Sequence, residues 1–547
     1  MKTNVSLCIV AALMVAACGD PSHRHNSGEK VSVINSTPDE VIEEDVEITS
    51  NEAALMEPSA NATSKMILSS PPPPQQRNAE TYKEIKENSF VAVAQQPVTT
   101  FSADIDRAAY ANVRRIIGYG QIPPKDAVRI EEMVNYFDYD YPAPEEGSVS
   151  PLRVSPELAP APWNPNHLLL RIGLQAKKID LAKAPPSNIV FLIDVSGSMD
   201  EENKLPLLQS SFKLLLGQLR PDDKVAIVTY ANGTKVALPS TRVKDKEKII
   251  KVLDNLYASG GTSGGRGIQL AYEQAQKSFI KNGNNRIILA TDGDFNIGIN
   301  NTTDLEKFIE KQRESGIYMS VLGFGMGNYR DDMAETIADK GNGNYAYIDN
   351  ITEAKKVLVN ELSGTLFAVA KDVKLQLEFN PKYVKEYKLI GYENRMLANE
   401  DFTNDKKDAG EIGAGHTVTA LYELVPSDGK VAQSLRYQSQ ELNEKGKGNE
   451  LGFLKIRYKD PKVKDAKSVE ITEPLVFNKK ALKETSTDYR FAASVAEFGI
   501  LLRDNSNKAN ATYDQVIELA EGAIGKDPEG YRKEFVRLVK SVKMLPK

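Results

Sequence analysis

Between residues 188 and 365 the spacing of the hydrophobic positions alternates along the chain. Short apolar runs predict buried strands, and the stretches between them carry apolar residues at intervals of three and four, which predicts helices. Strands that alternate with helices predict an α/β fold with a doubly wound, mostly parallel sheet and helices on both faces. We expect strands at 189–193, 225–230, 286–291, 317–323 and 344–348, and helices near 205–219, 246–256, 265–281, 303–314, 331–340 and 352–364.

The patterns on either side of this region predict two flanking units. Residues 98–187 combine helical spacing with an apolar run at 168–174, which predicts a small N-terminal α+β unit that ends near Pro185-Pro186. Residues 370–547 begin with alternating apolar positions and end with helical stripes. We therefore expect a C-terminal domain that is β-rich at first and helical at its end.

Residues 1–17 have the pattern of a secretory signal peptide. Lys2 precedes an apolar run of about 13 residues, which is too short to span a bilayer. The residues Val15-Ala16-Ala17-Cys18 resemble a bacterial lipobox, in which the cysteine is acylated and becomes the N-terminus. We expect a lipoprotein anchored through Cys18 to a membrane of the bacterial cell envelope, inner or outer. A plain signal peptide with an incidental Cys18 is the alternative.

Residues 18–97 predict a mostly disordered spacer. Within 20–97 there are thirteen acidic and six basic residues, a proline run at 71–74 and no sustained hydrophobic period. Such a composition buries too little apolar surface to offset the entropy of the chain.

Composition excludes several classes of protein. The net charge of −6 argues against a nucleic-acid binder, which needs a basic face. The chain has two cysteines and four histidines, too few for a disulfide scaffold or a zinc ribbon. No HExxH motif is present, which excludes that class of zinc protease.

Oxygen-bearing side chains cluster where the predicted strands end. A carboxylate and two hydroxyls follow the first strand at alternate positions, a hydroxyl precedes a later helix, and a second carboxylate follows the strand at 286–291. Ligands of doubly wound sheets bind beyond the carboxyl ends of strands. Oxygen ligands suit a hard cation, and Mg²⁺ is our first expectation, with Mn²⁺ or Ca²⁺ also accepted. The candidate metal ligands are Asp194, Ser196, Ser198, Thr262 and Asp292.

These five residues resemble the metal ion-dependent adhesion site of the von Willebrand factor type A domain. That resemblance assigns Asp194-x-Ser196-x-Ser198 to a first loop, Thr262 to a second and Asp292 to a third. It implies a Rossmann-like domain that spans about 188–365. The sequence departs from many relatives after Thr262, where Ser263 replaces a second threonine, but this removes no assigned ligand.

Segments outside the domain extend the resemblance to a bacterial family. In that family a characteristic N-terminal segment precedes the type A domain and a C-terminal domain of unknown function follows it. The resemblance covers roughly 98–547 and implies a fold and a metal site rather than a biological role. The matching segments are 101–106, 110–115, 130–137, 289–296, 389–395, 414–416 and 420–423.

A few other residues have candidate roles with simpler structural explanations. Asp104 and Asp106 could bind Ca²⁺, although a turn or an ion pair is the simpler expectation. Asp294 could support the third loop with or without a role at the metal. We expect His416 to be structural and Trp163 to be an anchor packed on a domain.

Taken together, the sequence predicts a cell-envelope lipoprotein that binds another protein through a divalent cation. An Asp or Glu carboxylate of the partner would complete the metal shell. The alternative is a scaffold protein whose metal only orders loops while the flanking domains bind the partner. We do not expect an enzyme, because no general base is evident beside the candidate ligands.

Overall fold

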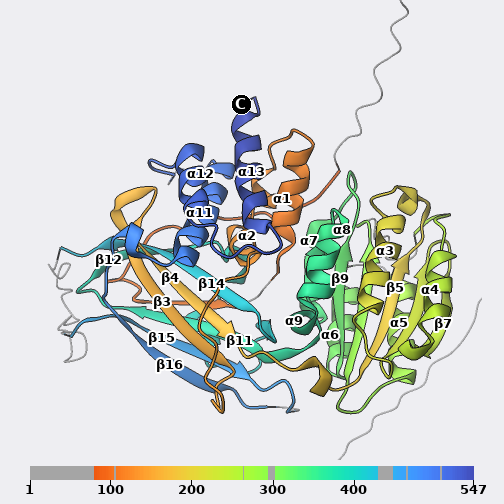
Figure 1. Cartoon of the computed structure of the whole chain (residues 1–547). Coiled ribbons are helices and arrows are strands. Elements are labelled where there is room, and N and C mark those ends of the chain that lie inside the picture. Colours follow the sequence, from red (N-terminus) through yellow and green to blue (C-terminus); the bar gives the residue numbers. More distant parts are fainter. Residues whose placement is uncertain are drawn as a thin grey trace, which may run out of the picture. The chain divides into compact units, whose positions relative to one another are not determined.

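The computed structural model describes residues 79–103, 106–262, 264–293, 302–428, 448–463, 466–504 and 508–546 (Figure 1). The predicted signal peptide, Cys18 and the spacer as far as residue 78 lie outside this part of the chain. Among the helices described here, none combines the length and the apolar character needed to cross a bilayer.

Six strands between residues 187 and 347 form one sheet in the order β10-β9-β8-β5-β6-β7. All neighbours are parallel except β6 and β7, which pair antiparallel. This confirms the predicted doubly wound sheet. The strands are β5 (Ser187–Asp194), β6 (Lys224–Tyr230), β7 (Thr234–Arg242), β8 (Asn284–Thr291), β9 (Ile317–Gly323) and β10 (Tyr345–Tyr347).

Helices cover both faces of this sheet, and we call residues 187–366 the α/β domain. Alternate residues of β5 point to opposite faces: Val190 and Leu192 join one apolar cluster, and Ile189 and Phe191 join another. Helices α5, α6 and α7 supply the first cluster, while α3, α4, α8 and α9 supply the second. Their bounds are α3 (Leu205–Leu216), α4 (Lys246–Asp254), α5 (Gly264–Lys277), α6 (Thr302–Arg313), α7 (Asp331–Lys340), α8 (Ile351–Lys355) and α9 (Leu362–Leu366).

The hydrophobic pattern did not predict strand β7. It carries Pro239 and only half-buried apolar positions on most of its length, so it lacks the apolar run of a central strand. Proline cannot donate a backbone hydrogen bond and is confined to the edges of sheets. The edge position of β7 is therefore consistent with its sequence.

Two further sheets combine strands from both sides of the α/β domain. One has the order β1-β12-β14-β4-β3, and the other has the order β13-β11-β15-β16 with β2 paired to β11. The strands before the domain are β1 (Val91–Ala92), β2 (Val98–Ser102), β3 (Leu152–Ala161) and β4 (Asn164–Ala176). Those after it are β11 (Ala368–Phe379), β12 (Val384–Ile390), β13 (Gly410–Gly413), β14 (Thr417–Pro426), β15 (Glu450–Lys459) and β16 (Val469–Val476).

This strand pairing corrects the expectation of two separate flanking units, 98–187 and 370–547. Strand β4 pairs antiparallel with β14, where Leu170 lies opposite Tyr422. Strand β2 pairs antiparallel with β11, where Thr100 lies opposite Gln376. One apolar cluster contains residues of both sheets. The two segments therefore form one structure, which we call the flanking body.

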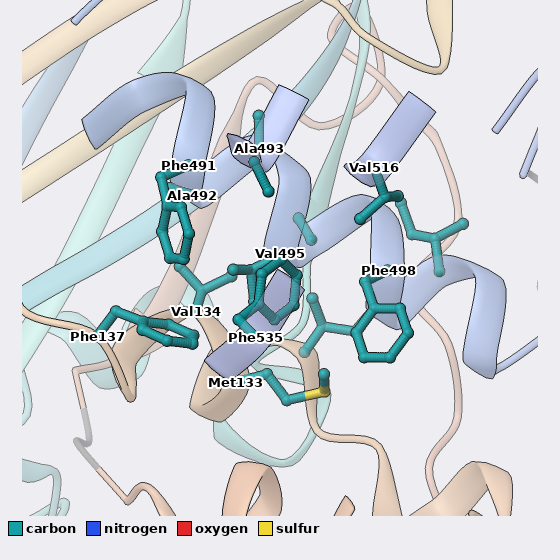
Figure 2. Close-up of a cluster of buried hydrophobic side chains, with 14 of the residues drawn as sticks. Met133, Val134, Phe137, Phe491, Ala492, Ala493, Val495, Phe498, Val516 and Phe535 are labelled. Carbon is teal, nitrogen blue, oxygen red and sulfur yellow. The ribbon is translucent and has the colours of Figure 1, made fainter. Parts of the chain in front are cut away.

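Helices from both segments also share a hydrophobic core (Figure 2). The predicted stripe of Phe491, Val495 and Phe498 on α11 packs with Met133 and Phe137. Trp163 is fully buried in the same cluster, which confirms its role as an anchor. The helices are α1 (Ala108–Gly118), α2 (Ile130–Asn135), α11 (Thr487–Leu502), α12 (Tyr513–Glu521) and α13 (Tyr531–Met544).

Residues 79–97 were predicted to belong to the spacer, but they pack on the folded chain. The backbone N–H of Ala79 donates to the carbonyl of Gly327 at 2.8 Å, and that of Thr81 donates to Tyr329 at 3.0 Å. The buried Glu80 carboxylate pairs with the Arg115 guanidinium at 2.8 Å. Backbone hydrogen bonds, an ion pair and the burial of Val93 hold this segment, and none of these produces a sustained hydrophobic period in the sequence.

Candidate metal centre

The candidate ligands lie where the strand order of the α/β sheet reverses. From β5 the chain continues to β6 and β7 on one side, and then crosses over to β8, β9 and β10 on the other. The carboxyl ends of β5 and β8 are neighbours, since Ile193 lies opposite Ala290. Asp194 ends β5 and Asp292 directly follows β8. The two carboxylates thus stand at the switch point, where open α/β sheets form binding crevices.

The first loop directs its polar atoms toward one another. The backbone N–H of Ser196 donates to Asp194 Oδ1 at 2.9 Å, and the hydroxyls of Ser196 and Ser198 are 3.1 Å apart. Asp194 and Ser196 are buried, while Ser198 is half-buried. The loop therefore runs from a buried carboxylate to a hydroxyl near the surface.

The second loop is hydrogen-bonded to the first. The backbone N–H of Gly197 donates to the carbonyl of Gly260 at 2.9 Å, and the N–H of Ser259 donates to Val195 at 2.8 Å. Gly260 has a φ of +79°, and a Cβ there would lie 2.3 Å from the Asn232 amide, so only glycine fits. Thr262 follows two residues later and is half-buried.

The third loop turns sharply after β8. Asp292 is fully buried, and the next residue, Gly293, has a φ of +85°. The Gly293 N–H donates to Thr291 Oγ1 at 3.1 Å, and Thr291 Oγ1 lies 3.5 Å from Asp194 Oδ2. This loop thus holds its own carboxylate beside that of the first loop. Asp294, which could support it, lies outside the described residues.

Burial of two neighbouring carboxylates makes the centre electrostatically costly without a cation. Desolvation raises the pKa of Asp194 to about 6; hydrogen bonds from Ser196 oppose this rise, and the charge of Asp292 adds to it. A divalent cation between the two carboxylates would remove this penalty, because an opposite charge favours the ionised form.

A lysine that the sequence analysis did not single out already supplies a positive charge here. The Lys204 ammonium lies 3.2 Å from Asp292 Oδ2 and donates to the Ser198 carbonyl at 2.8 Å. It is only 2% exposed. The sequence holds a signal for it, since Lys204 directly precedes α3 and lies four positions before the buried Leu208, whose backbone N–H donates to the Lys204 carbonyl at 2.8 Å.

These residues fit a divalent cation. They offer carboxylate and hydroxyl oxygens from neighbouring loops, the donor type that a hard divalent cation prefers. Among the described residues of the first two loops, the exposed positions Gly197, Gly260 and Gly261 carry no side chain. On that side another molecule has space to approach the buried oxygens.

Two of the other candidate residues have structural surroundings. Asp106 is buried and pairs with Arg395 at 2.8 Å, as expected of an ion-pair role, whereas Asp104 lies outside the described residues. His416 is buried against Gly364, and desolvation together with Arg107 lowers its pKa to about 3. A neutral, buried imidazole of this kind is structural.

Comparisons with known proteins agree with this architecture. The family model described as "von Willebrand factor type A domain" matches residues 188–360. A model described as "von Willebrand factor" matches 76–171, a range that contains the packed segment 79–97. The model described as "Uncharacterized protein YfbK, C-terminal" matches 364–545.

Individual relatives include proteins of similar length. The chain is 48% identical over 465 residues to "Uncharacterized protein YfbK" of Escherichia coli, a match that covers 84% of this chain and 80% of that protein. It is 26% identical over 326 residues to "Uncharacterized protein sll0103" of Synechocystis, which covers 60% of this chain and 74% of that one. Among solved structures, "von Willebrand factor type A from Catenulispora acidiphila" has 15% identity and a TM-score of 0.40, and the match covers 71% of this chain and 89% of that one.

Type A domains mediate protein–protein interactions, and many of them bind a divalent metal. The domain model, the C-terminal model and the 48% identical relative together cover almost the whole described chain. The chain therefore belongs to the bacterial family of von Willebrand factor type A proteins that includes Escherichia coli YfbK.

Proposed function

We propose that this protein is a cell-envelope lipoprotein that binds another protein through a divalent cation at the α/β domain. Mg²⁺ is the proposed ion, and Mn²⁺ or Ca²⁺ would be accepted by the same oxygens. The observation that carries the proposal is the convergence of two buried carboxylates and a serine pair at the switch point of the sheet. The proposed ligands are Asp194, Ser196, Ser198, Thr262 and Asp292.

The choice of ligands suits recognition of an anion. Serine and threonine hydroxyls are neutral, so they leave more of the charge of the ion available to a further ligand. A partner that offers an Asp or Glu side chain would supply that ligand as a carboxylate. Glycines at the rim of the first two loops allow the partner to approach.

We propose binding rather than catalysis. The two histidines in the described part of the chain, His167 and His416, both lie in the flanking body. His167 contacts Glu423 at 2.6 Å there. No imidazole among the described residues is therefore available to the centre as a general base.

A crosslinked pull-down from native membranes tests the metal-dependent contact. The baits are the wild type in Mg²⁺, the wild type in EDTA, Asp292→Ala in Mg²⁺ and, as a matched control, Asp200→Ala in Mg²⁺. Asp200 is an exposed acid beside the first loop, so its loss should leave capture unchanged. We expect a partner that only the wild type in Mg²⁺ and Asp200→Ala capture.

Capture of the same proteins by all four baits would contradict the proposal. The metal would then only order loops, and the flanking body would bind the partner, as in the scaffold alternative. Deletion of 370–547 does not discriminate between the two, because this segment supplies sheet partners to residues 98–176. Point substitutions at the three loops are therefore the cleaner experiment.

The proposed lipid anchor has its own test. Cys18→Ser should move the protein from the membrane fraction to the soluble fraction while its Mg²⁺ affinity stays unchanged. A variant that remains with the membrane would contradict anchoring through Cys18 without affecting the metal centre.

A further inference from the structure

A second group of buried carboxylates lies far along the chain from the three loops, where the α/β domain meets the flanking body. Oxygens of Asp106, Glu132 and Glu335 all lie within 4.8 Å of one another. Asp106 precedes α1, Glu132 lies on α2, and Glu335 lies on α7 of the α/β domain. Each of the three residues is at most 4% exposed.

Most oxygens of this cluster accept a hydrogen bond, but one does not. Asp106 accepts from the backbone N–H of Tyr345 at 2.9 Å, and Glu132 accepts from that of Ala109 at 3.0 Å. Glu335 Oε1 accepts from Arg395 at 3.1 Å, whereas Glu335 Oε2 is buried and has no hydrogen-bond partner. A buried carboxylate oxygen left unpaired is costly and calls for a compensating group.

The charges of the cluster do not balance. Asp331, one turn before Glu335 on α7, adds a fourth buried carboxylate. Two guanidiniums oppose these four, Arg129 paired with Asp331 at 2.6 Å and Arg395 paired with Asp106 at 2.8 Å. With all four carboxyl groups ionised, two negative charges would remain in a buried site, and desolvation opposes this by raising the pKa of Glu132 and Asp331. The Lys83 ammonium also acts on Glu335, but from the exposed surface, where water screens it.

Glu335 keeps its charge despite its burial. Desolvation raises its pKa, but the guanidiniums of Arg129 and Arg395 outweigh that effect and hold the pKa below its ordinary value. The unpaired oxygen therefore belongs to a carboxylate rather than to a protonated acid.

Arg395 links the cluster to a neighbouring cavity. This residue lines a cavity of about 290 Å³, together with Asp339, Lys340, Asn342 and Glu411. The same guanidinium contacts Asp106 and Glu335. The Arg395 side chain thus separates the cavity from the buried carboxylates.

We propose that Asp106, Glu132 and Glu335 form a second divalent cation site, selective for Ca²⁺, that fastens the α/β domain to the flanking body. Oxygens within 4.8 Å of one another can share one Ca²⁺, whose ligands lie at about 2.4 Å. Ca²⁺ tolerates irregular sets of carboxylates, whereas Mg²⁺ requires a near-ideal octahedron. Because the ligands come from the segment before the domain and from α7 within it, the ion would join the two regions. This site does not depend on the function proposed for the three loops.

Terbium luminescence can detect this site separately from the first. Tb³⁺ replaces Ca²⁺ and is excited through nearby tyrosines; the Tyr345 hydroxyl donates to Asp331 at 2.7 Å, beside the cluster. The full chain is titrated as three variants: Asp292→Ala, Asp292→Ala with Glu335→Gln, and Asp292→Ala with Glu310→Gln. Glu310 is a partly exposed acid that pairs with Lys340 and serves as the matched control.

We expect Asp292→Ala to keep one saturable Tb³⁺ signal that Ca²⁺ displaces. Glu335→Gln should weaken this binding at least tenfold, while Glu310→Gln leaves it unchanged. Asp106→Asn provides a second variant should Glu335→Gln fail to fold, as judged by circular dichroism in EDTA. Equal binding with and without the cluster substitutions, or no binding in the Asp292→Ala chain, would overturn the proposal and leave a network of ion pairs. Failure of the pull-down to capture a Mg²⁺-dependent partner, with Tb³⁺ binding to the cluster intact, would instead count against the first site.

Discussion

The α/β domain and the flanking body are built from the chain in opposite ways. The domain is one continuous stretch in which five parallel strands are joined by helices. The body brings together two stretches that lie on either side of the domain and pairs their strands antiparallel. The comparison shows that one protein can contain a region whose contacts are mostly local and a region whose contacts depend on distant segments.

The two regions also treat buried charge differently. The domain places Asp194 and Asp292 at a loop crevice whose rim is exposed. The body buries Glu497 on α11 within an apolar helical cluster. The charge of Asp194 and Asp292 can attract a ligand at an exposed crevice, whereas desolvation favours the neutral, protonated form of Glu497.

The largest effect should come from removing the distant segment. A chain that ends at residue 367 lacks β11 and β14, so β2 loses its partner and β4 keeps only β3. We expect residues 98–176 to lose protection in hydrogen exchange, while a fragment of residues 180–368 unfolds cooperatively on its own. Protection of 98–176 in the truncated chain would show that the body folds without its second half.

A single buried ion pair tests whether the two regions unfold together. Asp331→Ala removes one of the two carboxylates that pair with the buried Arg129 guanidinium, 2.6 Å away, and leaves it only Glu132. We expect a loss of about 1.5–3 kcal/mol in the free energy of unfolding. Urea denaturation measures it, with one probe in each region. Asp332→Ala, at a half-buried neighbour, should cost far less.

The buried acid of the body predicts a pH dependence. Desolvation raises the pKa of Glu497 to about 8, above its value of about 4.3 in an unfolded chain. Between these values the folded state holds a proton that the unfolded state lacks, so this residue makes stability fall as pH rises.

We therefore expect Glu497→Gln to stabilise the protein by about 1–3 kcal/mol at pH 8 and hardly at all near pH 4. Denaturation curves at the two pH values measure the difference. Glu518→Gln, at an exposed acid on α12, should change neither. An equal gain at both pH values would place the cause outside the titration of Glu497.

The smallest effect concerns Lys204 in the metal centre. Its ammonium neutralises Asp292 but would repel a cation bound beside it. We expect Lys204→Met to increase the Mg²⁺ affinity several-fold, as measured by calorimetry. Lys213→Met, at a half-exposed residue of α3, the helix that follows Lys204, is the matched control. An unchanged or weaker affinity would show that Lys204 supports the bound ion instead of competing with it.

Local pattern was sufficient to predict the α/β domain. Its parallel strands are largely apolar because helices cover both faces, whereas the edge strand β7 is not and was missed. Each candidate loop follows or precedes an element that the pattern identifies. All five candidate ligands lie on loops that hydrogen bonds join in the structure. Thr262 lies on the second of these loops, two residues beyond Gly260, which accepts one of those bonds.

The shared sheets, the packing of segment 79–97 and the burial of Lys204 could not be predicted from the spacing of hydrophobic positions. The pairing of β4 with β14 joins residues about 250 positions apart, and neither sequence shows its partner. Backbone hydrogen bonds help to hold segment 79–97, and they leave no pattern in the sequence. The buried Lys204 ammonium is stabilised by its ion pair with Asp292, a residue distant in the sequence. A search for charged residues on apolar helix faces would have found Lys204 but not the shared sheets.

The insertion of the α/β domain between β4 and β11 has a consequence for the order in which the protein can mature. Strand β4 carries an apolar core and emerges from the ribosome well before β14, which lies beside it in the finished sheet. During that interval the β3–β4 hairpin has one unsatisfied apolar edge, the kind of surface that promotes aggregation. We expect the nascent or translocating chain to require a holding chaperone until residue 426 has emerged, although the inserted domain can already be folded by then.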